Sequence, residues 1–340
     1  MSILNRKKVD KIPFAAYSFL LPRGEVERKL RKKGCLIFHF ERVYALEMKN
    51  VEIWQKEGLE KGRKCILRRF CTPVGNLEEK ILVDPGYESQ WIKEFLIKKP
   101  QDYEIMKFIV ENTIYYPNYE FFQQAAEDLG DDGILFATID RTPFQRILYE
   151  LAGPERLLVD VLESPDLVEG LLEILDKKME EVYQIVADSP ASMVHTWDNV
   201  TEDMTPPALF QRYCLPFYQK VGKLLHDRGK IYLVHMDGKL RHLEDLIASA
   251  PIDVVESFTL PDAGGNLEVE EAQKKWPEKT IIANIPAYLC FKEEEFIKRY
   301  FEELISKVER NRFMVCLSED LPHDSWKKAL ISISDVLNSL

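Results

Sequence analysis

The chain lacks a run of about 18 apolar residues, the minimum for a transmembrane helix, so we expect no membrane span. Its first ten residues are mostly polar and lack the apolar segment of a secretory signal, which favours a cytoplasmic location. The six cysteines include no Cys-x-x-Cys pair and are irregularly spaced. This pattern predicts reduced thiols and argues against a disulfide framework.

Excess positive charge is also missing, because 46 Lys and Arg stand against 57 Asp and Glu, a formal net charge of −11. Phosphate binding requires a basic surface, so this balance argues against nucleic acid as the main partner. The patterns GxGxxG, GxxxxGK[ST], GxSxG and HExxH are absent. Dinucleotide binding, P-loop phosphate binding and serine hydrolysis therefore lose most of their support.

The sequence does contain short apolar runs that are each followed by polar or turn residues. The runs span residues 12–19, 35–40, 133–140, 192–199, 231–238, 254–258, 280–285 and 312–319. Such runs are typical of parallel strands buried on both faces, and helical periodicity fills the stretches between most of them. The alternation predicts an α/β protein with a TIM (β/α)8 barrel, and residues 1–340 are expected to form a single domain.

The N-terminal third is less regular than the rest. Residues 65–84 predict a β-hairpin that turns at Gly75-Asn76. We expect this hairpin to belong to an irregular insertion over about residues 35–90 that lies over one barrel mouth.

Polar residues gather at the ends of the predicted strands. They are Tyr17, Asp140, Arg141, Asp198, Asn199, His235, Asp237, Glu256, Asn284, Glu319 and Asp320. TIM-barrel active sites lie at the C-terminal ends of the strands, so these residues are candidates for a site. Helix capping and turn formation are the alternative role for each of them.

The sharpest cluster is His235-Met236-Asp237-Gly238. Residues two apart on a strand share a face, so His235 and Asp237 should point the same way. Glu256 ends the next predicted strand and Glu319 ends the last one. His235, Glu256 and Glu319 could hold Zn²⁺ with one position open to substrate, and whether Asp237 joins them stays open. In the alternative, His235 only bonds a neighbouring carboxylate and no metal binds.

Aromatic residues crowd the same predicted end of the barrel. They are Tyr17, Phe19, Trp197, Phe258 and Tyr288. They could be ordinary core residues, or they could line a mouth that takes a flat, apolar substrate beside a polar centre.

Several segments together are similar in order and spacing to the second half of the uroporphyrinogen decarboxylase superfamily. They are IYLVHMDG (231–238), VVESF (254–258), the pair Gly265-Asn266, IIANIP (281–286) and MVCLSEDLP (314–322). The resemblance covers roughly residue 133 to the C-terminus and implies a TIM barrel and a homodimer.

Residues 12–19 of this chain contain no arginine. The decarboxylases of this superfamily have an Arg-rich segment there, which binds the carboxylates of the porphyrin. The thiol-specific corrinoid methyltransferases hold zinc with a His-x-Cys motif and a later cysteine. Here the motif is His235-x-Asp237, and Glu319 stands near the place of the later cysteine. Oxygen ligands leave a more Lewis-acidic zinc, which suits an oxygen substrate.

The chain thus resembles the first methyltransferase of O-demethylase systems. This resemblance implies methyl transfer from a methoxylated aromatic compound to the Co(I) corrinoid of a partner protein, with Zn²⁺ on the ether oxygen. Asp198 and Asp237 would be catalytic, and Asp198 would orient the substrate or pass a proton. The residues expected to bind substrate are Tyr17, Phe19, Asp140, Trp197, Asn199, Phe258, Asn284 and Tyr288. Three alternatives stay open: a thiol or other corrinoid methyltransferase, a porphyrinogen decarboxylase or other lyase, and a non-catalytic partner of a corrinoid protein.

Overall fold

The computed structural model describes residue 4, residues 10–84 and residues 90–340. These residues form two compact units. The barrel unit takes the chain up to Arg42 together with Tyr119–Ile139 and Ser189–Leu340, and the second unit takes Val43–Asn118 and Asp140–Asp188. The expectation of a single domain over 1–340 stays a prediction.

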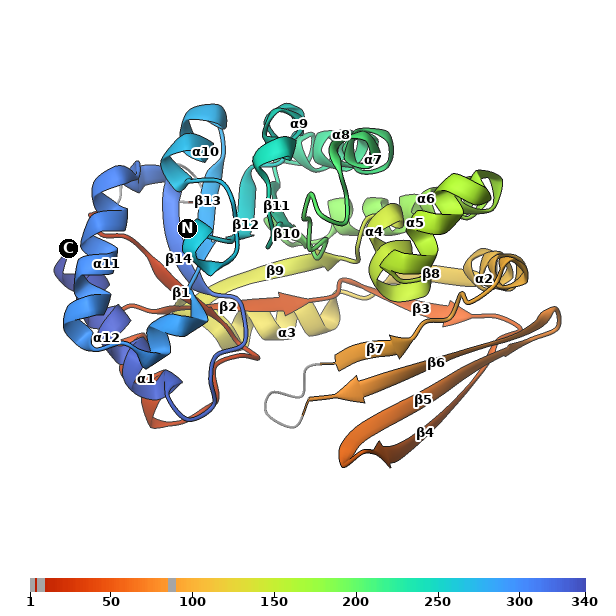
Figure 1. Ribbon diagram of the computed structural model, residues 1–340, viewed down its shortest axis with the longest axis horizontal. Helices are drawn as coiled ribbons and strands as arrows, with labels where there is room; N and C mark the ends of the chain where they lie inside the picture. The colour runs from red at the N-terminus through yellow and green to blue at the C-terminus, as the bar shows by residue number, and fades with distance from the viewer. Residues whose placement is uncertain (1–3, 5–9, 85–89) are drawn as a thin grey trace. The chain divides into compact units, whose positions relative to one another are not determined.

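Eight parallel strands close the barrel in the order β1-β14-β13-β12-β11-β10-β9-β2. Their bounds are β1 Phe14–Tyr17, β2 Leu36–Glu41, β9 Gly133–Ile139, β10 Met193–Thr196, β11 Ile231–His235, β12 Val254–Phe258, β13 Thr280–Asn284 and β14 Phe313–Leu317 (Figure 1). Each strand lies within or overlaps one of the eight predicted runs, so the TIM barrel is confirmed. All residues of β1, β10, β12, β13 and β14 are buried, as expected for strands covered on both faces.

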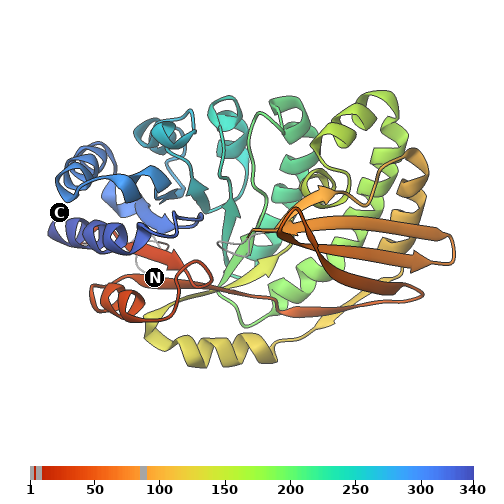
Figure 2. The same ribbon diagram turned by 60° about the horizontal axis from the view of Figure 1, so that its bottom comes forward.

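Helices follow the strands around the outside of the barrel, and Figure 2 shows the series from green to blue side by side. The helices of this unit are α1 Glu25–Lys32, α3 Glu120–Leu129, α7 Pro207–Leu209, α8 Leu215–His226, α9 Glu244–Ser249, α10 Val269–Lys275, α11 Glu294–Lys307 and α12 Trp326–Ser339. A π-helical stretch, η3 (Phe210–Cys214), joins α7 to α8, and short 3-10 segments are η1 Gly130–Asp132, η4 Arg241–Leu243, η5 Pro261–Ala263, η6 Ala287–Phe291 and η7 Arg310–Arg312.

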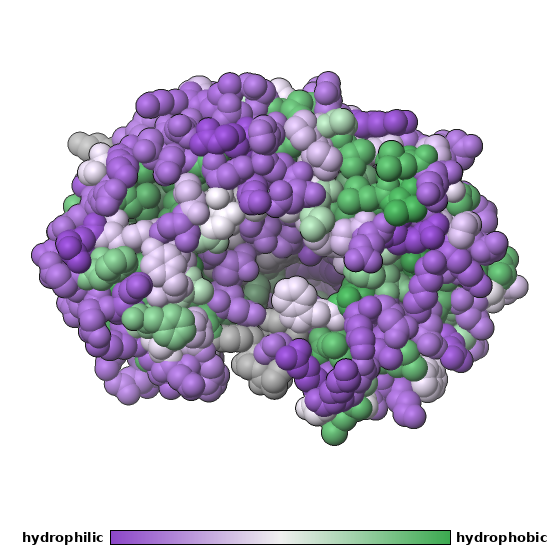
Figure 3. Space-filling view, viewed as in Figure 1, coloured by the Kyte–Doolittle hydropathy of each residue, from purple (hydrophilic) through white to green (hydrophobic). Residues whose placement is uncertain are grey.

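The helices are amphipathic. In α8, Phe217, Val221 and Leu225 are buried while Lys223 is exposed, so one stripe faces the strands and the other faces water. In the view of Figure 3 the exposed surface is accordingly mostly hydrophilic. Among the described residues, no helix has the length and hydrophobicity that crossing a membrane requires.

The second unit contains two antiparallel sheets and helices. Strands β3 (Tyr44–Met48) and β8 (Thr113–Pro117) pair with each other, and β4 (Glu52–Glu60), β5 (Arg63–Thr72), β6 (Gly75–Val83) and β7 (Gln90–Glu94) form a four-stranded sheet. Its helices are α2 Pro100–Glu111, α4 Pro143–Arg146, the π-helical η2 Ile147–Leu151, α5 Pro154–Glu163 and α6 Pro165–Asp188. The insertion predicted for about residues 35–90 falls mostly within this unit.

The predicted hairpin is confirmed as β5–β6, but its predicted turn is wrong. Thr72 pairs with Gly75, so Pro73 and Val74 form the turn instead of Gly75-Asn76. Pro73 presets the φ angle of the first turn position, and the Thr72 hydroxyl bonds both Gly75 O (2.6 Å) and Val74 N (3.2 Å). Gly75 has φ 141°, and a Cβ there would lie 2.7 Å from Ile105 Cδ1 of α2. The glycine therefore serves close packing on α2.

Candidate functional site

The site is built on neighbouring strands of the barrel. His235 of β11 is directly paired in register with Glu256 of β12, so both side chains lie at the same level near the C-terminal ends of the strands. The register of β12 shifts between Val255 and Phe258, and Ser257 has φ 58°. Such a bulge re-aims side chains, and here consecutive residues reach the site, because Glu256 contacts His235 and Ser257 contacts Glu319.

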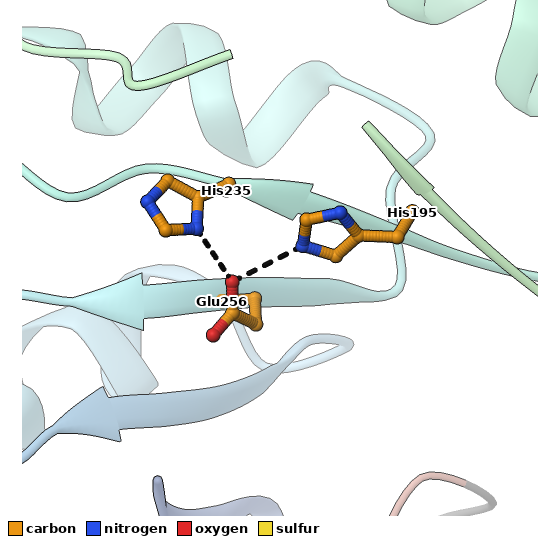
Figure 4. Close-up of side chains that lie close together, drawn as sticks. All are labelled: His195, His235 and Glu256. Atoms are coloured by element: carbon orange, nitrogen blue, oxygen red, sulfur yellow. Dashed lines mark hydrogen bonds and ion pairs between the residues drawn. The ribbon is translucent and has the colours of Figure 1, made fainter. Parts of the chain in front are cut away.

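One edge of the His235 ring is held by Glu256. The Nδ1–H group donates to Glu256 Oε2 at 2.8 Å, and His195 Nε2–H donates to the same oxygen at 3.1 Å (Figure 4). Both histidines and Glu256 are buried. With Nδ1 protonated and bonded in this way, the unprotonated nitrogen of a neutral His235 would be Nε2.

The other edge of the ring faces two more carboxylates. His235 Nε2 lies 3.6 Å from Asp237 Oδ2 and 3.7 Å from Glu319 Oε1. These separations are too long for hydrogen bonds. Asn199 Nδ2 donates to Asp237 at 2.8 Å, and Ser257 Oγ donates to Glu319 at 3.1 Å, so both carboxylates have supporting partners.

Electrostatic coupling in the cluster is strong. Burial pushes the pKa of His235 down, but Glu256 and Asp237 outweigh it and raise that pKa well above its usual range. Burial pushes the pKa of Glu256 up, but His235 and His195 bring it down to about 2. For Glu319, burial is the main cause of a pKa raised to about 7, with further upward contributions from Asp237 and Glu256. Three carboxylates around one imidazole leave an excess of negative charge that a cation would neutralise.

Two buried polar atoms of this cluster have no partner within the described structure, namely Glu256 Oε1 and His195 Nδ1. Buried polar atoms are normally satisfied, so an orphaned carboxylate oxygen points to a bound water, ion or ligand group.

Candidate ligand atoms fall into two sets. His195, His235 and Glu256 form a fully buried set, and His235, Asp237 and Glu319 form a more accessible one; within each set the ligand atoms lie within 4.8 Å of one another. Glu256 and Glu319 face opposite nitrogens of the His235 ring. The structure therefore groups Asp237, in place of Glu256, with His235 and Glu319.

An aromatic wall stands beside this cluster. The Trp197 ring lies 5.8 Å from the rings of both Tyr17 and His235, 6.4 Å from Phe19 and 4.7 Å from Phe40. Phe19 is 65 % exposed, so the wall reaches solvent. The predicted residues Tyr17, Phe19 and Trp197 thus come together.

Other predicted residues have different surroundings. Asn199 and Asn284 lie at the site, where Asn199 bonds Asp237 and Asn284 Oδ1 accepts from Ser318 Oγ at 3.2 Å. Phe258 is buried against Trp276, with ring centroids 6.2 Å apart. The hydroxyl of Tyr288 donates to Asp262 at 2.5 Å.

Two further predicted aspartates, Asp198 and Asp140, are not members of the two ligand sets found among the described residues. Asp198 is fully buried and accepts a 2.5 Å hydrogen bond from the hydroxyl of Tyr218 on α8. Asp140 directly follows β9 and belongs to the second unit.

Sequence reasoning missed His195, Phe40 and Ser257 as members of the site. His195 stands two residues before Trp197, a spacing that places both side chains on one face of β10, and this signal was available. Phe40 stands two residues after Phe38, so the two rings share one face of β2. Ser257 had no such signal, because its contact depends on the bulge in β12.

Comparisons with known proteins agree with this architecture. The family model described as uroporphyrinogen decarboxylase (URO-D) matches residues 92–329, well over half of the chain. Among solved structures, a methyltransferase from Methanosarcina mazei aligns with a TM-score of 0.61 at 10 % identity and covers 99 % of this chain and 96 % of that one. A B12-independent methionine synthase from Shewanella sp. W3-18-1 aligns with a TM-score of 0.39 at 12 % identity, covering 91 % and 84 %. At these identities the first likeness shows a shared fold alone. No curated protein matches the sequence.

Proposed function

Because the chain belongs to the uroporphyrinogen decarboxylase family, we propose that its barrel mouth carries out corrinoid-dependent methyl transfer. In this proposal the methyl group of a methoxylated aromatic compound passes to the Co(I) corrinoid of a partner protein. The observation that supports this proposal most strongly is an oxygen-rich cluster beside an aromatic wall. The cluster contains His235, Asp237 and Glu319, and the wall contains Tyr17, Phe19 and Trp197.

The cluster fits a zinc ion held by His235 Nε2, Asp237 and Glu319. Ligand atoms that share a tetrahedral zinc at about 2.1 Å lie about 3.4 Å apart. The observed separations of 3.6 and 3.7 Å from His235 Nε2 are close to that value. A Zn²⁺ ion bound there would act as a Lewis acid on the ether oxygen and would stabilise the departing phenolate.

The remaining residues of the cluster would hold the ligands in place. Glu256 and His195 fix the ring of His235 and its tautomer, and Asn199 and Ser257 orient the carboxylates of Asp237 and Glu319. Outer partners of this kind typically raise metal affinity by about 10–100-fold.

The aromatic wall would bind the ring of the methyl donor. Flat apolar rings pack edge-on or offset against aromatic side chains, and the exposed Phe19 leaves one side open for entry. Co(I) is already a strong nucleophile, so the chain needs no general base for the attack. Its tasks are to position the donor and to exclude water from the reacting bond.

Thiol methylation has less support from the geometry. Cys316, the cysteine next to the cluster in sequence, is fully buried inside β14, and burial raises the pKa of its thiol well above the usual range. A protonated, enclosed thiol does not provide the thiolate-rich site that thiol activation requires.

The direct test is a methyl-transfer assay with zinc-loaded protein and Co(I) cobalamin or a corrinoid protein. Methoxybenzoates and small methylated compounds are supplied in parallel, and formation of methylcorrinoid is followed by its absorption spectrum. Simple thiols are methyl acceptors, so they are supplied in a separate arm with methylcob(III)alamin, and loss of methylcorrinoid is followed there. We expect methylcorrinoid with one or more methoxyaromatics and none with His235→Ala. Formation of methylcorrinoid only with the non-aromatic compounds, or decarboxylation of a porphyrinogen, would contradict the proposal.

A further inference from the structure

We propose a second, separate site on the outer wall of the barrel, where Ser18, His39 and Glu41 form a nucleophile–base–acid chain that hydrolyses small carboxylic esters. This activity goes beyond the proposed methyl transfer and uses none of its residues.

The three residues stand at the C-terminal ends of two neighbouring strands. Ser18 directly follows β1, and His39 and Glu41 are alternate residues of β2, which pairs with β1. Phe38 and Phe40, which alternate with His39 and Glu41 along β2, pack on rings inside the barrel. Because side chains alternate along a strand, His39 and Glu41 point away from the interior. His39 and Glu41 are therefore on the opposite side of β2 from the aromatic wall.

The hydrogen bonds follow the order that nucleophilic catalysis requires. Glu41 Oε1 lies 3.1 Å from His39 Nε2, and the Ser18 hydroxyl lies 2.9 Å from His39 Nδ1. A carboxylate at Nε2 accepts a hydrogen bond and keeps the proton on that nitrogen. The unprotonated Nδ1 then faces the hydroxyl of Ser18 and can take its proton.

These residues line a pocket of about 360 Å³ that is bounded by α1, α3 and β2. The volume lies in the range of small-molecule sites. Ile37, Phe121 and Leu129 supply apolar surface, and Arg23 supplies a positive charge. The side chains of His39 and Glu41 are 33 % and 34 % exposed, so a small molecule can reach them. The charged lining is mixed, because Asp128 and Asp132 stand beside Arg31, and Arg23 pairs with Glu27 at 3.3 Å. The lining therefore suits a small uncharged ester with a short apolar part.

The chemistry balances without a cofactor. The Ser18 oxygen bonds to the ester carbonyl carbon while His39 Nδ1 takes the hydroxyl proton. The bond from carbonyl carbon to alkoxy oxygen then breaks, and the alcohol leaves with that proton. Water attacks the acyl-Ser18 carbon, gives one proton to His39 Nδ1, and the proton returns to Ser18 as the carboxylic acid departs.

This site does not require the GxSxG motif, because that motif belongs to one strand–turn–helix geometry. Here the nucleophile directly follows β1, and the base lies on β2, 21 positions later in the sequence.

The test combines covalent labelling with turnover. A fluorophosphonate probe should modify Ser18, as read by peptide mass spectrometry, and the protein should hydrolyse p-nitrophenyl acetate. We expect Ser18→Ala to abolish labelling and His39→Ala to lower hydrolysis by about 100-fold or more, the range for loss of a general base.

Two controls separate this site from others. Ser306 is an exposed serine of α11 whose hydroxyl donates to the Glu303 carbonyl oxygen. The variant Ser306→Ala should be labelled at Ser18 like wild type. His235→Ala should keep full esterase activity, whereas Ser18→Ala should keep methyl transfer, so each proposal can fail without the other. Circular dichroism would show that each variant is folded. No modification of Ser18, or hydrolysis unchanged in folded Ser18→Ala, would overturn the proposal.

Discussion

Glu256 shows how one residue can be identified correctly from sequence while its role depends on geometry. Its position at a strand end marked it as a site residue, but the structure places it against Nδ1 of His235, with the orphaned Oε1 pointing elsewhere. In the proposed zinc site, Glu256 would act on metal binding through the ring that it orients.

We predict that Glu256→Gln weakens zinc binding by about 10–100-fold, the usual effect of losing an outer partner, and leaves some binding intact. Asp237→Asn should weaken it more, because a direct ligand loses its charge. Isothermal titration of both variants with Zn²⁺ gives the comparison. Equal losses in the two variants would show that Glu256 is itself a ligand.

The cysteines allow a prediction with a defined pH dependence. Burial raises the pKa of Cys35 to about 12 and that of Cys290 to about 11. Only the thiolate reacts, so alkylation of these two residues in the folded protein should be very slow at pH 8 and should accelerate as pH rises towards those values. Cys65 and Cys71, which are partly exposed, should react first. Mass spectrometry after a short iodoacetamide pulse measures this order, and early modification of Cys35 would contradict it.

At the level of elements, the strands and the loops that follow them differ in how well the sequence specifies them. The eight barrel strands were predictable because each is a short run that must be apolar on both faces. The bulge at Ser257 was not, because a residue at φ 58° inside a strand is held there by tertiary contacts, such as the hydrogen bond between the hydroxyls of Ser257 and Ser318. His195 falls within the predicted strand over 192–199, but its bond to Glu256 depends on the register between strands, which the sequence does not specify.

The loop after β11 carries a prediction at this scale. A Cβ on Gly238 would lie 2.2 Å from Thr201 Cβ, so the loop must approach the one after β10 closely. Gly238→Ala should displace the adjacent Asp237 from Asn199, lower the free energy of unfolding by about 1–3 kcal/mol and weaken zinc binding.

Gly58→Ala is the matched control, because the added Cβ would meet only Cys65 Sγ at 3.6 Å, an ordinary contact. Denaturant unfolding and zinc titration of the two variants test the pair. A Gly238→Ala protein with wild-type stability and zinc affinity would show that this close approach does not matter.

For the whole molecule, the fold and the family could be predicted because they rest on patterns spread over many residues. The second unit was predicted only in part. Its hairpin was visible, and so was the helical periodicity of the stretch that forms α6. The pairing of β3 with β8 joins segments far apart in sequence, so it depends on long-range contacts.

Zinc should also stabilise the folded protein as a whole. A ligand that binds only the folded state adds about 2.7 kcal/mol at a concentration of 100 times Kd, so Tm should rise with added Zn²⁺. Scanning calorimetry of wild type and His235→Ala tests this, and an equal rise in both would place the stabilising ion elsewhere.

The central claim is that His235 anchors a catalytic zinc at the barrel mouth. The most direct test is the zinc content of purified protein, measured by mass spectrometry after zinc is supplied and excess is removed. The control is His242→Ala, because His242 is an exposed histidine that bonds Glu202 outside the cluster. We predict about one zinc per chain in wild type and in His242→Ala, and almost none in His235→Ala. Wild-type protein without zinc, or His235→Ala with a full zinc complement, would contradict the account.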